Sequence, residues 1–206
     1  MTGIAEAIAA ADVGAVLQAD LVPLVPRGRL RVTYNWLYSA LNCDPNDGSR
    51  FPWVVTKLDD THVSLSPAAQ YNGMTVYASV RDDWSWYVQV QAPHSADWIT
   101  GVGRDEWIGM QSVGGLVVAL TGFNGQAIAV DANPDSHDWH TGYRVQSVGS
   151  SDPQSRLWFL GVSQVLQEGV KVTLASDVTD DVIRESLTAA GVDGAEAVAN
   201  VKSVLS

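Results

Sequence analysis

A repeat of tryptophan-led segments constrains the fold of this chain more than any other feature of the sequence. Trp53 opens a segment with the pieces W-V-V-T, V-S-L, N-G-M-T-V-Y-A and Y-V-Q-V, and Trp107 opens one with W-I-G-M, V-A-L, N-G-Q-A-I-A-V and Y-R-V-Q. Trp158 marks a third start, and the three tryptophans stand 54 and 51 residues apart. Periods of this size are typical of symmetry-related supersecondary units. We therefore expect three related units.

Short strands separated by turn residues make up each unit. Residues 63–65, 118–120 and 172–174 alternate as half-buried strands do, and each follows a tryptophan. Asn-Gly turns at 72–73 and 124–125 lead into further strands. With residues 30–34 taken as a copy of each unit's last strand, eleven strands are predicted. A twelfth would complete three four-stranded units, and we expect it in residues 13–25.

Both ends of the chain have helical patterns. Ile4, Ile8, Ala11 and Ala15 lie at helical spacing in the first 20 or so residues, and prolines then indicate a linker. At the other end, Thr179 is expected to cap a helix through residue 190, and Asp193 with Glu196 to start a second helix.

We therefore divide the chain into a helical segment and linker at 1–29, a β domain at 30–175 and a helical hairpin at 176–206. Short helices are marginal in water, so their apolar faces must be buried. Either the β domain or a partner, such as a second copy of the chain in a homodimer, covers them.

Three units with the pattern W-x-x, V-x-L, G and A resemble a β-trefoil, with spacing similar to that of ricin-B-like lectins and fascin-like proteins. The resemblance implies an all-β fold, a β-trefoil of three four-stranded units, with short helices at the N- and C-termini. Ricin-B-like lectins carry Q-x-W in their repeats, whereas the triplets here are F-P-W, D-E-W and R-L-W. Trefoils also serve as protease inhibitors, cytokines, actin bundlers and toxin-targeting modules, so the fold alone does not choose a function.

Composition and charge exclude several classes of partner. The chain has 12 Lys and Arg against 23 Asp and Glu, a net charge of −11, so this acidic protein repels nucleic acid and anionic membranes. No run approaches 18 apolar residues, so no membrane span is expected. The N-terminus lacks the pattern of a secretory signal, and Cys43 is the single cysteine. We expect a cytoplasmic protein, or one released without a cleaved signal peptide.

The eight tryptophans divide into two sets. Trp53, Trp107 and Trp158 recur once per unit, so we expect them to build the core. The functional prediction rests on the second set, which lies in polar loops beside acids. Sugars bind against an aromatic face together with placed polar groups. We predict a lectin-like site for a glycan or glycoprotein, whose ligand-binding residues are Asp83, Trp84, Trp98, Asp138, Trp139, Asn72 and Asn124.

Three alternatives stay open. The acids of these loops also fit turn capping, with the indoles covering the barrel rim. A protein-binding trefoil, such as a protease inhibitor or a toxin or targeting module, would use an exposed rigid loop, and residues 42–50 and 150–156 are the candidates. An enzyme would need His137 and His140 to converge with nearby acids such as Asp131 and Asp135. We do not expect an enzyme, because no catalytic motif is present, and we predict no cofactor and no metal.

Overall fold

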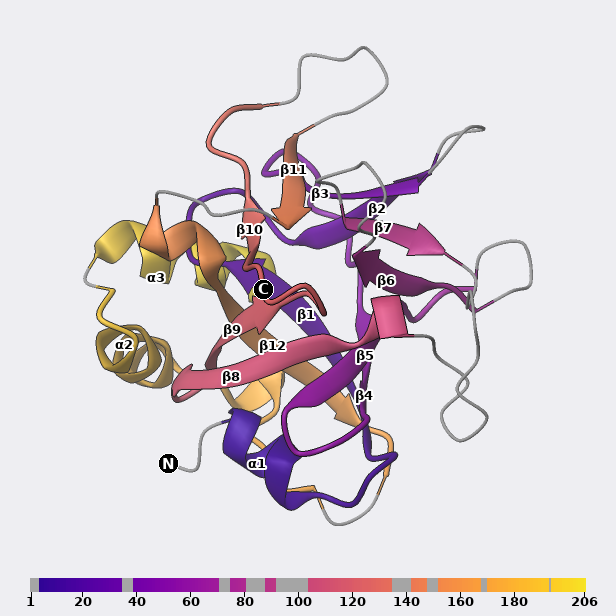
Figure 1. The fold of residues 1–206 in the computed structure, drawn as a ribbon. Coiled ribbons are helices and arrows are strands. Elements are labelled where there is room, and N and C mark those ends of the chain that lie inside the picture. The colour runs from indigo at the N-terminus through magenta and orange to yellow at the C-terminus, as the bar shows by residue number, and fades with distance from the viewer. Residues whose placement is uncertain are drawn as a thin grey trace.

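The computed structural model describes residues 4–34, 39–70, 75–80, 88–91, 104–134, 142–147, 152–167, 170–192 and 194–206. Within these ranges the chain forms twelve β-strands, three α-helices and three short 3-10 helices (Figure 1). The strands are β1 (Val16–Pro23), β2 (Leu30–Tyr34), β3 (Ser39–Cys43), β4 (Trp53–Lys57), β5 (His62–Pro67), β6 (Tyr77–Val80), β7 (Val88–Gln91), β8 (Ile108–Gly114), β9 (Val117–Thr121), β10 (Ile128–Val130), β11 (Tyr143–Ser147) and β12 (Leu157–Val165). The α-helices are α1 (Ile4–Ala10), α2 (Asp180–Ala189) and α3 (Ala195–Leu205).

Six strands close into a barrel in the order β1-β12-β9-β8-β5-β4. Neighbouring strands of the barrel are antiparallel. The other strands form a second sheet in the order β10-β11-β3-β7-β6, with β2 paired to β3. Along the chain, one barrel strand, two strands of the second sheet and one barrel strand follow one another three times. The protein is therefore all-β, with a closed six-stranded barrel and short helices at its ends (Figure 1).

The twelfth strand lies in the predicted range. β1 falls within residues 13–25 and pairs with β12 on one edge and with β4 on the other. The expectation of a helical segment and linker over 1–29 was therefore wrong for residues 16–23, which are a barrel strand. Pro23 is the last residue of β1.

Two other strand predictions need correction. Residues 172–174 are not a strand, because β1 and β9 already occupy the two edges of β12. Residues 30–34 do form the strand β2, but it pairs with β3, which the sequence analysis did not identify. It is β3, not β2, that joins β7 and β11 in the second sheet. The predicted copy of the last strand was therefore assigned to the wrong segment.

Helix α1 is shorter than predicted, and a lysine from the barrel holds its end. The ammonium of Lys57 donates to the carbonyl oxygens of Ala9, at 2.5 Å, and Ala11, at 2.7 Å. The last carbonyls of a helix lack partners within it, and a cation there also interacts favourably with the negative end of the helix dipole. The Lys57 side chain is only 3 % exposed, so this contact ties α1 to the barrel wall.

The two C-terminal helices pack on the barrel, beside one another at the left of Figure 1. Thr179 caps α2 as predicted, its hydroxyl oxygen accepting from the amide of Val182. The cap of α3 is Gly194, so the predicted start at Asp193, which lies outside the described residues, was displaced by one residue. Buried side chains such as Leu187 and Val201 belong to the main hydrophobic core, so the barrel covers these helices.

The repeat tryptophans divide into two environments. Trp53 and Trp158 are fully buried, and their indole N–H groups donate to the carbonyl oxygens of Leu30, at 2.9 Å, and Ile128, at 3.0 Å. These acceptors are the first residues of β2 and β10, and the core prediction is confirmed for both indoles. For Trp107 the prediction was wrong, because that residue is only half-buried and the next residue in sequence is fully buried in its place.

Candidate functional site

Most of the predicted ligand-binding residues lie outside the described part of the chain. These are Asp83, Trp84, Trp98, Asp138, Trp139 and Asn72. Asn124 is described, and its side-chain oxygen accepts from the amide of Gln126, at 3.0 Å, and from the hydroxyl of Ser147, at 3.3 Å. The side-chain oxygen of Asn124 thus stabilises the turn by accepting two hydrogen bonds. Its contact with a ligand stays a prediction.

A groove of about 330 Å³ lies on the outer face of the barrel, over β1, β4 and β5. Side chains of a strand alternate between two faces, so every second residue of β4 and β5 points away from the core. The strand register places Val16, Thr56 and Ser64 in one cross-strand row on that outer face. Val55 and Leu65, which point the other way, are buried in the core.

The polar lining of this groove is uncharged. We call it the hydroxyl groove, after the side chains of Thr56, Ser64, Ser66, Gln70, Thr75 and Tyr77. Within the described ranges, these six side chains make no hydrogen bond to any other residue. None of the described residues that line the groove carries a charge. The groove therefore offers hydroxyl and amide groups, which both donate and accept, and one phenol ring. The rest of its lining is apolar: Val16, Val54, Leu58, Pro67 and Ala68.

The hydroxyl groove lies next to one of the segments that the sequence predicted to bind a ligand. Gln70 and Thr75 line it, and they flank residues 71–74, which include the predicted ligand residue Asn72. Sequence reasoning missed the groove itself. The signal was present in Ser64 and Ser66, which alternate with apolar residues along β5, and in Thr56 near the end of β4.

A second polar cluster surrounds Trp107 at the turn between β4 and β5. The ring of His62 lies against the indole of Trp107, with ring centroids 5.5 Å apart and planes tilted by 52°. Asp59 accepts from the amides of Thr61, at 2.8 Å, and His62, at 2.7 Å, and its carboxylate lies 2.9 Å from the His62 ring nitrogen Nδ1. Partial burial would raise the pKa of Asp59, but these hydrogen bonds and the neighbouring imidazole together hold that pKa below its usual value. Asp59 therefore stabilises its own turn.

The residues proposed for catalysis or metal binding do not come together among the described residues. His137, His140 and Asp135 lie outside the described ranges. Asp131 accepts from Asn133 and Gln146, as a turn residue does. Among the residues that the structure describes, no three His, Cys, Asp or Glu side chains form a group that would hold a metal ion.

The thiol of Cys43 does not have the properties of a reactive nucleophile. Its side chain is fully buried in β3, and burial raises the pKa of the thiol far above its ordinary range, against a smaller opposite effect of the Arg31 charge. A thiol that stays protonated is unreactive. Separately, none of the helices in the described ranges has the length and apolar character needed to cross a membrane.

Comparisons with known proteins show a shared fold and no family. No family model matches the chain, and no curated protein matches it. Among solved structures, Cry35Ab1 is 16 % identical, with a TM-score of 0.52 over 79 % of this chain and 39 % of that chain. The Pmt1-Pmt2 protein O-mannosyltransferase complex of S. cerevisiae, bound to the sugar donor, is 13 % identical, with a TM-score of 0.51 over 87 % of this chain and 29 % of that chain.

The crystal structure of the lysenin pore is also similar, at 14 % identity and a TM-score of 0.48, over 75 % of this chain and 50 % of that chain. That TM-score is too low to indicate a common fold. The chain spans about two fifths of Cry35Ab1 and less of the mannosyltransferase chain. At such identities the similarity concerns the β-rich fold alone.

Proposed function

We propose that this chain is a carbohydrate-binding, lectin-like protein whose twelve strands form a β-trefoil of three four-stranded units. The order of strands supports the trefoil, since a barrel strand, two strands of the second sheet and a barrel strand follow one another three times. The two buried tryptophans support it as well. Trp53 and Trp158 donate to the first residues of β2 and β10, which hold equivalent places in two of the three units.

The observation that carries the glycan proposal is the hydroxyl groove. Its uncharged polar side chains match the hydroxyls of a sugar, which also donate and accept, and the Tyr77 ring suits the C–H face of a sugar. Covering a hydroxyl with an apolar ligand would leave it unsatisfied, at a cost of about 1–3 kcal/mol. A ligand that has hydroxyls as well as an apolar face, as a sugar does, therefore suits this lining better than a wholly apolar ligand. Its volume of about 330 Å³ suits a mono- or disaccharide.

The tryptophan loops predicted from the sequence belong to the same proposal. Asp83 with Trp84 and Asp138 with Trp139 supply an acid beside an aromatic face, the pattern of sugar sites. Trp98, Asn72 and Asn124 complete the predicted contacts. Asn72 stands in the segment between two groove residues, so in the proposal the groove and one predicted loop share a ligand.

A glycan array followed by calorimetric titration of the tightest ligand tests the proposal. Ser64→Ala removes a groove hydroxyl and is expected to weaken binding several-fold. Ser163→Ala is the matched control, because Ser163 is exposed on β12 and bonds only to the Gln18 carbonyl. If no glycan of a broad array binds, the proposal of glycan binding is overturned. Binding that survives Ser64→Ala but is lost in Trp84→Ala and Trp139→Ala would move the site from the groove to the loops.

One observation favours a second function, a protein-binding trefoil such as a protease inhibitor or a toxin or targeting module. The loop at 42–50 is exposed at its tip and braced internally. Asp44 accepts from the amide of Asn46 at 2.9 Å, Asp47 accepts from the amide of Ser49 at 2.8 Å, and Asp47 also pairs with Arg31. A braced loop that presents the exposed Arg50 fits an inhibitor. Inhibition of a serine protease from a panel, abolished by Arg50→Ala, would support this alternative over the lectin.

A further inference from the structure

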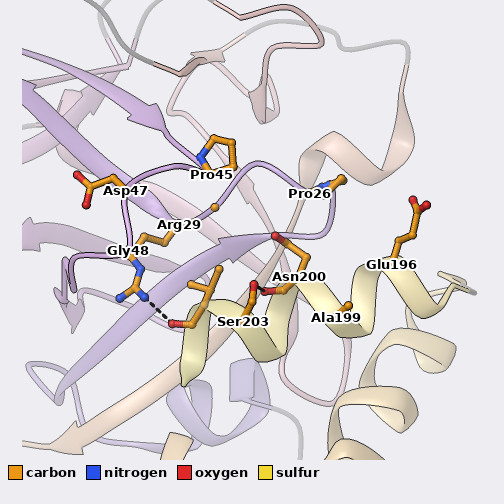
Figure 2. Close-up of a pocket in the computed structure, with 11 residues that line it drawn as sticks. Pro26, Arg29, Pro45, Asp47, Gly48, Glu196, Ala199, Asn200 and Ser203 are labelled. Carbon is orange, nitrogen blue, oxygen red and sulfur yellow. Dashed lines mark hydrogen bonds between the residues drawn. The ribbon is translucent and has the colours of Figure 1, made fainter.

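A second cavity has a volume of about 650 Å³ (Figure 2). It lies between α3, the connection from β1 to β2, which contains Pro26, and the loop from β3 to β4, which contains Pro45. We propose that this cavity binds a ligand with a cationic ammonium or guanidinium group on an alkyl chain. Such a group occurs in a free alkylamine and in a lysine or arginine side chain of a partner protein. The proposal is independent of glycan binding, because the cavity shares no lining residue with the hydroxyl groove.

Helix α3 contributes hydrogen-bond acceptors to the cavity. Glu196, Asn200 and Ser203 stand at i, i+4 and i+7, on one face of the helix (Figure 2). The Asn200 amide nitrogen donates to the carbonyl oxygens of Pro23, at 3.1 Å, and Val25, at 3.3 Å. With both amide protons directed there, its oxygen is left to accept.

The hydroxyl proton of Ser203 is also used within the protein. Its hydroxyl donates its single proton to the backbone carbonyl oxygen of Asn200 at 2.9 Å, so only its lone pairs are left. Glu196 adds an exposed carboxylate. This face of α3 therefore offers acceptors to a ligand that supplies donors, as an ammonium or a guanidinium group does.

The buried arginine beneath the cavity does not make it an anion site. One guanidinium nitrogen of Arg29 lies 3.2 Å from Asp20, and another donates to the Val204 carbonyl oxygen at 2.5 Å (Figure 2). The Arg29 and Asp20 side chains are each only 7 % exposed, and Asp20 neutralises the Arg29 charge at the edge of the cavity. Through Arg29, the hydrogen bond to Val204 and the ion pair with Asp20 together fix the last turn of α3 to strand β1 of the barrel.

The remaining electrostatics favour a cation. Arg29 pairs with Asp20 and Asp47 pairs with Arg31, so among the described charged residues that line the cavity the Glu196 carboxylate is left without an opposite charge beside it. The rings of Pro26 and Pro45 supply apolar walls, against which an alkyl chain packs while its charged head reaches the acceptors (Figure 2).

Titration of the full chain with 1,5-diaminopentane at low ionic strength tests this inference. We expect saturable binding that weakens as salt screens the charges, and no comparable binding of the neutral analogue 1,5-pentanediol. Glu196→Gln should weaken binding of the diamine by about tenfold, the usual effect of losing one charge-assisted hydrogen bond. Glu185→Gln removes the same charge from an exposed position on α2 and should leave the affinity unchanged.

The source of the cation is decided by a second titration, with a short lysine- and arginine-containing peptide. Tighter binding of the peptide than of the diamine identifies a protein partner, whereas the reverse order identifies a free amine. The proposal is overturned if both glutamine variants change the affinity equally, if 1,5-pentanediol binds as well as the diamine, or if inorganic phosphate binds in preference to both. Thermal melts of the variants establish that each has folded.

Discussion

The two faces of the β4–β5 hairpin serve different purposes. Trp53, Val55 and Leu65 point into the hydrophobic core, whereas Thr56 and Ser64 lie on the opposite face and line the hydroxyl groove, with Ser64 at its buried floor. The strand period of two places both sets on the same few residues. Core packing therefore fixes the positions of the groove hydroxyls within a rigid wall, which lowers the entropic cost of binding. The difference between the two faces predicts that substitutions inside change stability and substitutions outside change binding.

The largest expected effect is on the inner face. Trp53→Ala should lower the free energy of unfolding by about 3–5 kcal/mol, because it empties a core position and leaves the Leu30 carbonyl without its indole donor. Chemical denaturation measures the loss. The matched variant Trp107→Ala, at the half-buried repeat tryptophan, should cost much less. Equal losses in the two variants would contradict the division of the repeat tryptophans into core and surface.

The next largest effect on stability is expected at Lys57, the last residue of β4. Lys57→Met should lower the free energy of unfolding by about 1–3 kcal/mol, because two carbonyl oxygens at the end of α1 lose their donor. Lys202→Met provides the control, since the ammonium of Lys202 pairs with Asp180 at an exposed position, and exposed pairs contribute about 0–1 kcal/mol. Thermal melts compare them. If Lys57→Met is no worse than Lys202→Met, the buried lysine does not hold α1.

A smaller effect is expected at the turn that joins the two strands. The pKa of Asp59 is lowered in the folded state, so its ionised form stabilises the fold at pH values above the unfolded pKa of about 3.9. That stabilisation is lost as the pH falls through the folded pKa. Asp59→Asn should therefore be less stable than the wild type near neutral pH, and the gap should close in strong acid. A gap that is constant from pH 7 to pH 2, measured by denaturation, would contradict the assignment.

The smallest effect on stability is expected on the outer face. Thr56→Val keeps the shape of the side chain and removes a hydroxyl that has no partner among the described residues, so the free energy of unfolding should change by less than about 0.5 kcal/mol. Glycan affinity should nevertheless fall several-fold in calorimetric titration. A stable variant with unchanged affinity would remove Thr56 from the site.

Local patterns in the sequence predicted much of this fold. Strands β4, β5, β9 and β12 were expected from their tryptophan or V-x-L pieces, and the cap at Thr179 from its position before an amphipathic run. These features depend on residues close together in the chain. The position of β1 was inferred by counting, because one strand was missing from three four-stranded units.

Pairing between distant segments was not visible in the sequence. Residues 16–23 and residues 172–174 both have apolar residues at strand spacing, and only the pairing of β1 with β12 across the two ends of the chain decides between them. The pattern of the strand was also hidden by the buried Asp20, whose partner Arg29 comes from outside the strand.

The candidate site was less predictable than the fold for the same reason. One wall of the hydroxyl groove follows from alternation in β4 and β5, but Tyr77 reaches it from β6 through tertiary packing. Trp107 was misassigned because it directly precedes β8, and in extended chain a shift of one residue exchanges the inner and outer faces. Its neighbour Ile108 takes the buried position.

The central claim is that the hydroxyl groove holds a glycan, and amide chemical-shift mapping tests it most directly. The isotope-labelled chain is titrated with the tightest-binding glycan from the array. We predict concentration-dependent shifts centred on Thr56, Ser64, Ser66 and Tyr77, and their loss in Tyr77→Ala. Shifts confined to other surfaces, with these four amides unmoved at saturation, would contradict the account.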